Sequence, residues 1–142
     1  MKVFGYLLGS EAEGVLFIKE RHLLIPLNTL YKPVRLRKTM FRLLEFLLKK
    51  GGTELIRDET IMKSVWDSYG LKASGPRLWQ VMNALKNKLI ALGVSRDFIM
   101  RVESRGYRVN TNFFEPLYIR AAWEWLGQFL IERPHSASFS LS

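Results

Sequence analysis

Residues 76–109 read PRLWQVMNALKNKLIALGVSRDFIMRVESRGYRV, and two periodicities follow one another within this stretch. Before Gly93, apolar residues recur at helical spacing, and they are Leu78, Met82, Leu85, Leu89 and Leu92. This spacing predicts an amphipathic helix with Pro76 in its first turn and Gly93 just past its end. Beyond it, the extended runs Phe98–Val102 and Tyr107–Thr111 flank a turn that contains glycine, which predicts a β-hairpin. A long helix followed by a hairpin decides the fold.

Two shorter helices are predicted before this stretch. In the first, apolar residues share one face at i, i+3, i+4, i+7 and i+8, and they are Met40, Leu43, Leu44, Leu47 and Leu48. Gly51 and Gly52 end this helix, and Glu54–Ile56 is a candidate for a short strand. Asp58 is a suitable N-cap for the second helix, which ends at Gly70. Three helices therefore precede the hairpin.

The first 36 residues have a different pattern, rich in β-branched and aromatic residues with glycine and proline between the runs. It predicts four short strands in an antiparallel meander, at Val3–Leu8, Val15–Lys19, His22–Leu27 and Thr29–Leu36. The expected fold class is α+β: an antiparallel sheet over 1–36, then three helices and a hairpin wing over 37–112. This is the layout of a winged helix-turn-helix domain, with residues 1–112 as one domain.

Residues 113–142 are expected to form a C-terminal helical appendage with a frayed tail. Apolar side chains within Leu117–Ile131 follow helical spacing, so that this extra helix needs a surface to pack against. Packing onto the N-terminal sheet is one alternative, and a homodimer, a partner regulator or a membrane surface are others. The side chains predicted to lie at a partner or dimer interface are Trp123, Leu126, Phe129 and Leu130.

Composition excludes several function classes. The 142-residue chain has no cysteine and two histidines, so neither a disulfide, a thiol nucleophile nor a multi-histidine metal site is expected. Its carboxylates show no motif pairing with a nucleophile, which argues against an enzyme, and no cofactor is expected. The sequence contains no stretch of about 18 apolar residues, so that no membrane span is predicted, and no secretory signal is evident. A cytoplasmic protein is therefore expected.

The net charge of +9 is concentrated in the middle of the chain. Residues 35–112 hold 16 basic and 7 acidic residues, whereas residues 1–34 and 113–142 are close to neutral. A basic segment between neutral flanks favours a polyanion such as nucleic acid, with a solvated basic surface as the alternative. On the third helix, hydrogen-bonding side chains lie opposite the leucines, and they are Arg77, Gln80, Asn83, Lys86 and Asn87. Such groups suit phosphates and base edges, although most amphipathic helices have a polar face.

From about Leu36 to Val109 the chain resembles the OmpR/PhoB-type winged-helix DNA-binding domain. The matching pieces are Leu43-Leu44, Val65-Trp66, Leu85-Lys86-Asn87-Lys88-Leu89 and Arg105-Gly106-Tyr107-Arg108. The hairpin resembles the ToxR/CadC branch, which carries this domain without a phosphoacceptor receiver. The resemblance implies a transcriptional regulator that binds double-stranded DNA. Its third helix enters the major groove, and its basic wing contacts the backbone or the minor groove.

The resemblance also assigns individual positions. The DNA-facing positions of the third helix fall on Val81, Asn83, Ala84 and Lys86, where Lys86 replaces the usual arginine. An arginine near the hairpin turn in other branches is Glu103 here, so Arg101 or Arg105 would take its place. The loop over 68–75 corresponds to a segment that contacts RNA polymerase in several members, with a plain helix connector as the alternative.

Two functions remain open from the sequence. The first is the DNA-binding regulator without a receiver. The second is a protein-interaction module with weak or no sequence-specific DNA binding, which docks through its aromatic C-terminal helix. Val81, Ala84 and Glu103 favour the second, because none of them donates a hydrogen bond to DNA. Trp66 is expected in the core, and Trp79 is expected to be partly exposed.

Overall fold

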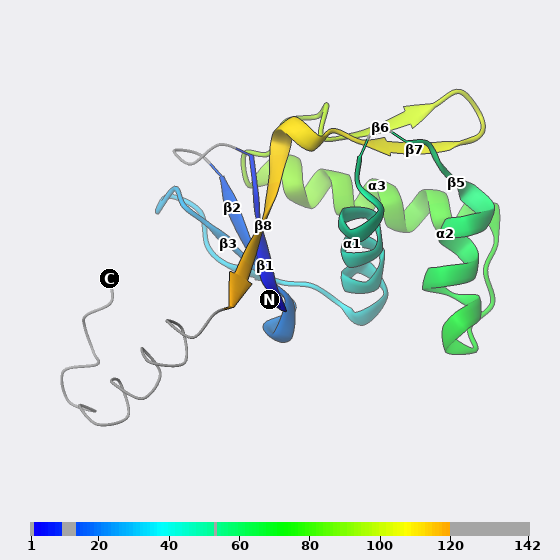
Figure 1. Cartoon of the computed structure of the whole chain (residues 1–142), viewed down its shortest axis with the longest axis horizontal. Helices are drawn as coiled ribbons and strands as arrows, with labels where there is room; N and C mark the ends of the chain where they lie inside the picture. Colours follow the sequence, from blue (N-terminus) through cyan, green and yellow to red (C-terminus); the bar gives the residue numbers. More distant parts are fainter. Residues whose placement is uncertain (1, 10–13, 53, 120–142) are drawn as a thin grey trace.

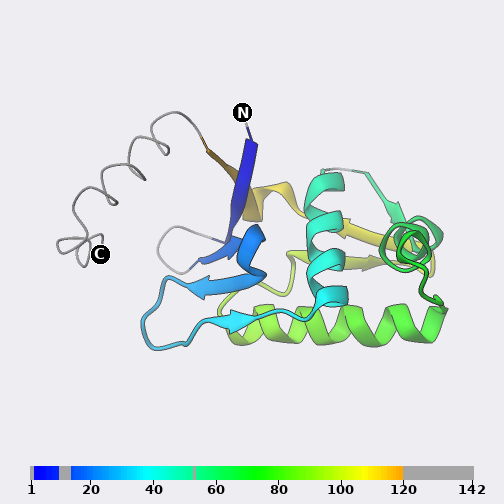
Figure 2. The ribbon, with the colours of Figure 1, turned by 90° about the horizontal axis from the view of Figure 1, so that it is seen from below.

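The computed structural model describes residues 2–9, 14–52 and 54–119. Its elements form two antiparallel sheets with three helices between and beneath them (Figures 1 and 2). The predicted winged helix-turn-helix order is confirmed. The helices are α1 (Lys38–Lys50), α2 (Asp58–Val65) and α3 (Gly75–Ala91), and the 3-10 turns are η1 (Lys19–Arg21), η2 (Asp67–Tyr69) and η3 (Thr111–Phe113).

The larger sheet has five strands in the order β4-β3-β2-β1-β8. Four come from the N-terminal meander, as predicted: β1 (Lys2–Leu8), β2 (Val15–Ile18), β3 (Leu23–Pro26) and β4 (Val34–Arg35). Alternate residues of β2 and β3 are fully buried, and Phe17 pairs with Leu24 across the two strands. This alternation places one face of the sheet on the core.

The fifth strand of this sheet corrects the expected domain boundary. β8 (Phe114–Ile119) pairs antiparallel with β1, from Leu8↔Phe114 to Lys2↔Ile119. The domain therefore extends past 112, and Leu117–Ile119, expected at the start of a helix, are strand residues. Helical spacing among apolar side chains did not reveal that β1 leaves an edge to be paired. The rest of the expected appendage, 120–142, lies outside the described residues.

The smaller sheet holds the wing, with strand order β5-β7-β6. The hairpin strands are β6 (Ile99–Val102) and β7 (Gly106–Val109), and the short β5 (Ile56–Arg57) pairs with β7. Figure 1 shows this sheet running along the top of the molecule, above the helices. β5 thus ties the start of α2 to the wing.

One hydrophobic core joins both sheets and all three helices. The predicted inner faces of α1 and α3 are buried, and Trp66 is 2% exposed, as expected. Phe114 connects the parts, because its ring lies edge-on to Tyr6 of β1 and to Phe98 before β6, both at 6.1 Å between centroids. The wing and the N-terminal sheet are therefore held in one packed body.

Candidate nucleic-acid interface

Helix α3 packs on the core through its apolar residues, and its opposite side is exposed. Leu78, Met82, Leu85 and Leu89 are at most 2% exposed. Ser74 caps the helix, because its Oγ accepts a hydrogen bond from the Arg77 backbone N–H at 3.1 Å. Figure 2 shows α3 along one side of the molecule, with α1 on its inner side only. Its outer side is therefore presented to solvent.

The outer side of α3 carries the residues predicted for DNA contact. Arg77, Gln80, Ala84 and Asn87 are exposed, and Val81, Asn83 and Lys86 are partly buried. Within its bounds α3 contains three basic residues and no acidic one. α1 and α2 each include at least one carboxylate, so α3 is the helix best suited to approach a polyanion.

A hollow separates α3 from the beginning of α1. It is lined by Gln80, Val81 and Ala84 of α3 and by Arg37, Lys38, Thr39 and Met40. Both cations are exposed, and the first turn of α1 contains no acidic residue. We call Arg37 and Lys38 the α1-side margin. Sequence analysis did not assign it, because nothing in the spacing tells which end of α1 meets α3.

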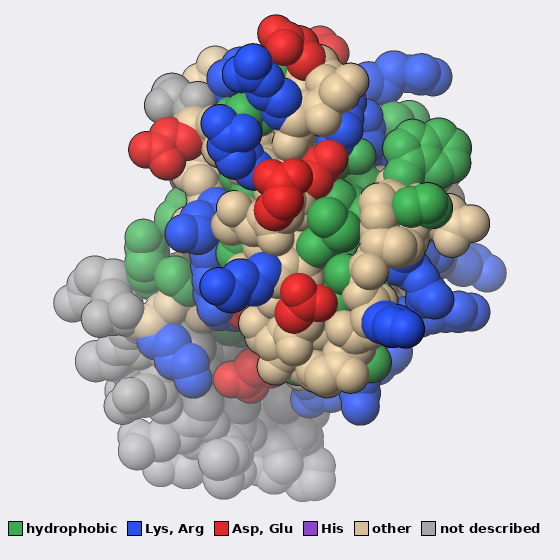
Figure 3. Space-filling view, turned by 90° about the vertical axis from the view of Figure 1, so that its right-hand side faces the viewer, with side chains coloured by type: hydrophobic (Ala, Val, Ile, Leu, Met, Phe, Trp, Pro, Cys, Tyr) green, Lys and Arg blue, Asp and Glu red, His purple; other side chains and the backbone are tan. Residues whose placement is uncertain are grey.

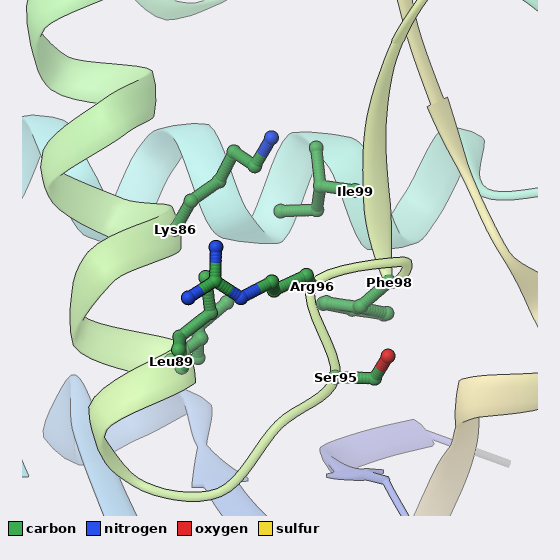
Figure 4. Close-up of a pocket in the computed structure, with 7 residues that line it drawn as sticks. Lys86, Leu89, Ser95, Arg96, Phe98 and Ile99 are labelled. Carbon is green, nitrogen blue, oxygen red and sulfur yellow. The ribbon is translucent and has the colours of Figure 1, made fainter.

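A second, smaller hollow lies on the other flank of α3, under the loop that leads to β6. Its lining is Lys86, Leu89, Ile90, Ser95, Arg96, Phe98 and Ile99. Figure 4 shows the Lys86 side chain extending from the helix toward Ile99 and the Arg96 side chain extending from the loop toward the helix. We call Lys86 and Arg96 the wing-side margin. Arg96 was not a predicted site residue, because it lies in a loop that shows no periodicity.

On the wing, Arg101 is paired with a carboxylate of the same chain at the surface. Its Nη1 and Nη2 donate hydrogen bonds to Asp58 Oδ1 at 2.7 Å and Oδ2 at 3.0 Å, and its guanidinium lies 4.7 Å from the ring centroid of Tyr107. The hydrogen bond to Asp58 raises the pKa of Arg101. Asp58 was expected to cap α2, but it is the first residue of the helix and its carboxylate binds Arg101 instead.

Arg105 lies at the hairpin turn and is free to reach outward. Its Nε is 3.8 Å from Glu103 Oε2, and the two side chains are 62% and 74% exposed. Such an exposed pair is weak and is readily exchanged for another partner. Of the two wing arginines predicted to contact DNA, Arg105 is therefore the accessible one and Arg101 is paired.

The side of the molecule that carries α2 has mixed charge. Figure 3 shows red acidic side chains in its middle, left and top, whereas the right-hand edge, toward α3, shows blue and green side chains. Trp79 of α3 is 62% exposed, as expected from its position off the buried stripe. In the 68–75 loop, Tyr69 is covered by Arg42 of α1, whose Cζ lies 3.5 Å from the ring centroid.

Metal-binding clusters and membrane-spanning helices are two further features to consider in the described residues. No group of three or more histidine, cysteine, aspartate or glutamate side chains among them could bind a metal ion. In the same part of the chain, no helix is long and apolar enough to span a membrane. Trp123, Leu126, Phe129 and Leu130, the predicted interface residues, lie outside it.

Comparison with solved structures shows the same fold in two proteins. The DNA-binding domain of E. coli CadC is 16% identical, covers 82% of this chain and 100% of its own, and superposes with a TM-score of 0.66. The C-terminal domain of the nisin resistance regulator NsrR, a lantibiotic response regulator, is 20% identical, covers 72% and 90%, and has a TM-score of 0.52. No curated protein matches the sequence.

The family model described as "Transcriptional regulatory protein, C terminal" matches residues 31–109. This match spans α1 to β7 and so includes the helix-turn-helix and the wing. The resemblance to OmpR/PhoB-type domains is thereby confirmed, and the chain belongs to the family of transcriptional regulatory protein C-terminal domains.

Proposed function

We propose that this protein is a transcriptional regulator that binds double-stranded DNA with α3 in the major groove. The observation that carries the proposal is the arrangement of charge around α3. The helix has no acidic residue, its outer side is open, and a pair of cations borders each of its flanks. A helix in the major groove needs this arrangement, because phosphates line both walls of the groove.

In this proposal the exposed amides of α3 read bases. Gln80 and Asn87 are exposed and Asn83 is half-buried, and each amide offers both a donor and an acceptor to a base edge. Val81 and Ala84 line the hollow beside them and offer only apolar contact, for example to a thymine methyl group. The cations at the margins supply affinity that does not depend on sequence.

The wing has a supporting role in this proposal. Arg105 at the hairpin turn contacts the DNA backbone or the minor groove, whereas Arg101 holds the wing against α2 through Asp58. The proposal also includes contact of the 68–75 loop with RNA polymerase, a homodimer through the helix expected from the sequence in the C-terminal region, and a cytoplasmic location. They rest on the resemblance and on the sequence.

The test is fluorescence anisotropy of labelled duplex DNA at several salt concentrations, with the upstream region of the protein's own gene and a scrambled duplex. We expect tighter binding to the upstream region and a steep fall in affinity with salt. Asn87→Ala should lower the preference for the upstream region by about 1–3 kcal/mol at one base pair, because one pair of hydrogen bonds to a base is lost.

Lys2→Gln provides the control for charge. Lys2 begins β1, on the side of the molecule opposite α3 in Figure 2, so its removal lowers net charge without touching the interface. Equal loss of affinity in Lys2→Gln and in α3 variants would contradict the proposed face. Absence of binding at low salt would instead favour the protein-interaction module.

A further inference from the structure

Lys86 occupies a position where the resemblance places a base-reading arginine, but its surroundings differ from those of the exposed amides. The outermost side chains of α3, such as Gln80 and Asn87, are exposed, whereas Lys86 is half-buried on the flank toward β6. It lines the small hollow with Arg96 (Figure 4). If α3 lies in the major groove as proposed, a side chain on this flank would face a wall of the groove and not the base edges at its floor.

Hydrogen bonds fix the backbone on both sides of Arg96, the second cation of the hollow. After α3, the chain reverses at Gly93 (φ 103°), and the Val94 N–H donates to the Leu89 carbonyl oxygen at 2.9 Å. The Asp97 N–H donates to Ser95 Oγ at 3.0 Å. Arg96 lies between Ser95 and Asp97, which are hydrogen-bonded to each other, so that its backbone is ordered before any ligand binds. Leu89, Phe98 and Ile99 form a buried apolar floor beneath it.

Nothing in this hollow neutralises the two cations. Its lining contains no aspartate or glutamate, and neither Lys86 nor Arg96 has an ion pair or a side-chain hydrogen bond within the described part of the chain. By contrast, the neighbouring wing cation Arg101 is satisfied by Asp58. Two cations on the lining of one small hollow, with no carboxylate among the lining residues, favour an anion bound at its mouth, and a tetrahedral oxyanion accepts from both an ammonium and a guanidinium.

We propose that Lys86 and Arg96 together bind one phosphate of the DNA backbone on the wing side of α3, so that Lys86 positions the helix and does not read a base. This inference rests on the proposed function and assigns a site within it. The helix would then be fixed in the groove by this clamp on one wall and by Arg37 and Lys38 on the other.

The experiment neutralises DNA phosphates one at a time with methylphosphonate and measures the affinity of the wild type, Lys86→Gln, Arg96→Gln and the double variant. In the wild type, neutralising one particular phosphate on the wing side of α3 should lower the affinity about tenfold, which is the loss expected for one charge-assisted contact. At that same position, neutralisation should have little effect on either variant. Each variant should also lower the slope of log K against log salt by about one.

Two controls separate this inference from its alternatives. Lys86→Arg keeps the charge and should keep the slope, and Lys2→Gln should leave the methylphosphonate profile unchanged. If Lys86→Gln alters base preference and leaves the slope intact, Lys86 reads a base and the clamp is wrong. If the two variants respond to different phosphates, the residues do not share one. If wild-type protein binds no duplex, the proposed function itself fails.

Discussion

At the scale of single residues, the pair formed by Arg101 and Asp58 determines how the wing is held. Both carboxylate oxygens are used, and the side chains are 37% and 19% exposed, so solvent screens the pair only in part. We expect Asp58→Asn and Arg101→Lys each to lower the free energy of unfolding by about 1 kcal/mol, because each loses the two-pronged geometry. Urea denaturation measures this loss.

A double-mutant cycle is the control for that pair. The two substitutions together should cost less than the sum of the single changes, because they remove the same contact. Additive losses would mean that the two side chains do not stabilise the wing through each other. DNA binding offers a second check. If the two substitutions only loosen the wing, the variants should keep the wild-type slope of log K against log salt.

Buried tyrosines link stability to alkaline pH. Burial raises the pKa of Tyr6 and of Tyr107 above the ordinary value of 10.0. Below pH 10 both are neutral in the folded and the unfolded chain, so their contribution is intact. As the pH rises above 10 the unfolded chain loses its phenol protons first, and stability falls. Tyr6→Phe should show a smaller fall between pH 9 and 11 in urea denaturation, and an identical fall would contradict this account.

At the scale of elements, the wing depends on a close approach between β5 and β7. A Cβ added to Gly106 would lie 2.1 Å from the Ile56 carbonyl oxygen, which belongs to backbone and cannot rotate away. We expect Gly106→Ala to lower the free energy of unfolding by about 1–3 kcal/mol, because β5 must shift. Gly75→Ala is the matched control, since a Cβ there meets nothing within 4 Å. A similar loss in both variants would exclude this explanation.

The strand β8 is the element that periodicity misassigned. Its first residue, Phe114, packs against Tyr6 and Phe98, whereas Tyr118 near its end is 51% exposed. We expect Phe114→Ala to lower the free energy of unfolding by about 2–3 kcal/mol, and Tyr118→Ala to change it little, because only the first empties part of the core. Equal effects in thermal or urea denaturation would indicate that β8 does not complete the sheet.

At the scale of the whole molecule, charged side chains lie on the surface and apolar side chains form the core. The core contains no buried polar or charged residue among those described, and cations from two other segments line the hollows beside α3. The start of α1 contributes Arg37 and Lys38, and the loop before β6 contributes Arg96, while Arg105 is exposed at the turn of the wing. The DNA interface proposed above would span more of a duplex than one helix can, and its affinity is therefore expected to depend steeply on salt.

The amino-acid sequence by itself determined the order of the elements and the buried face of each helix. Those features follow from local periodicity and from glycine, proline and serine at helix ends, which act over a few residues. It also identified the outer side of α3, from Arg77 to Asn87, because the opposite side of a buried stripe is fixed by helix geometry.

Only the tertiary structure decided how distant segments combine. The pairing of β8 with β1, the ion pair of Asp58 with Arg101 and the hollow that Lys86 shares with Arg96 combine residues whose spacing in the sequence carries no signal. Each depends on which surfaces the packed core brings together. The helix proposed to approach DNA could therefore be read from its pattern, whereas the side chains proposed to bind DNA phosphates could be found only in the fold.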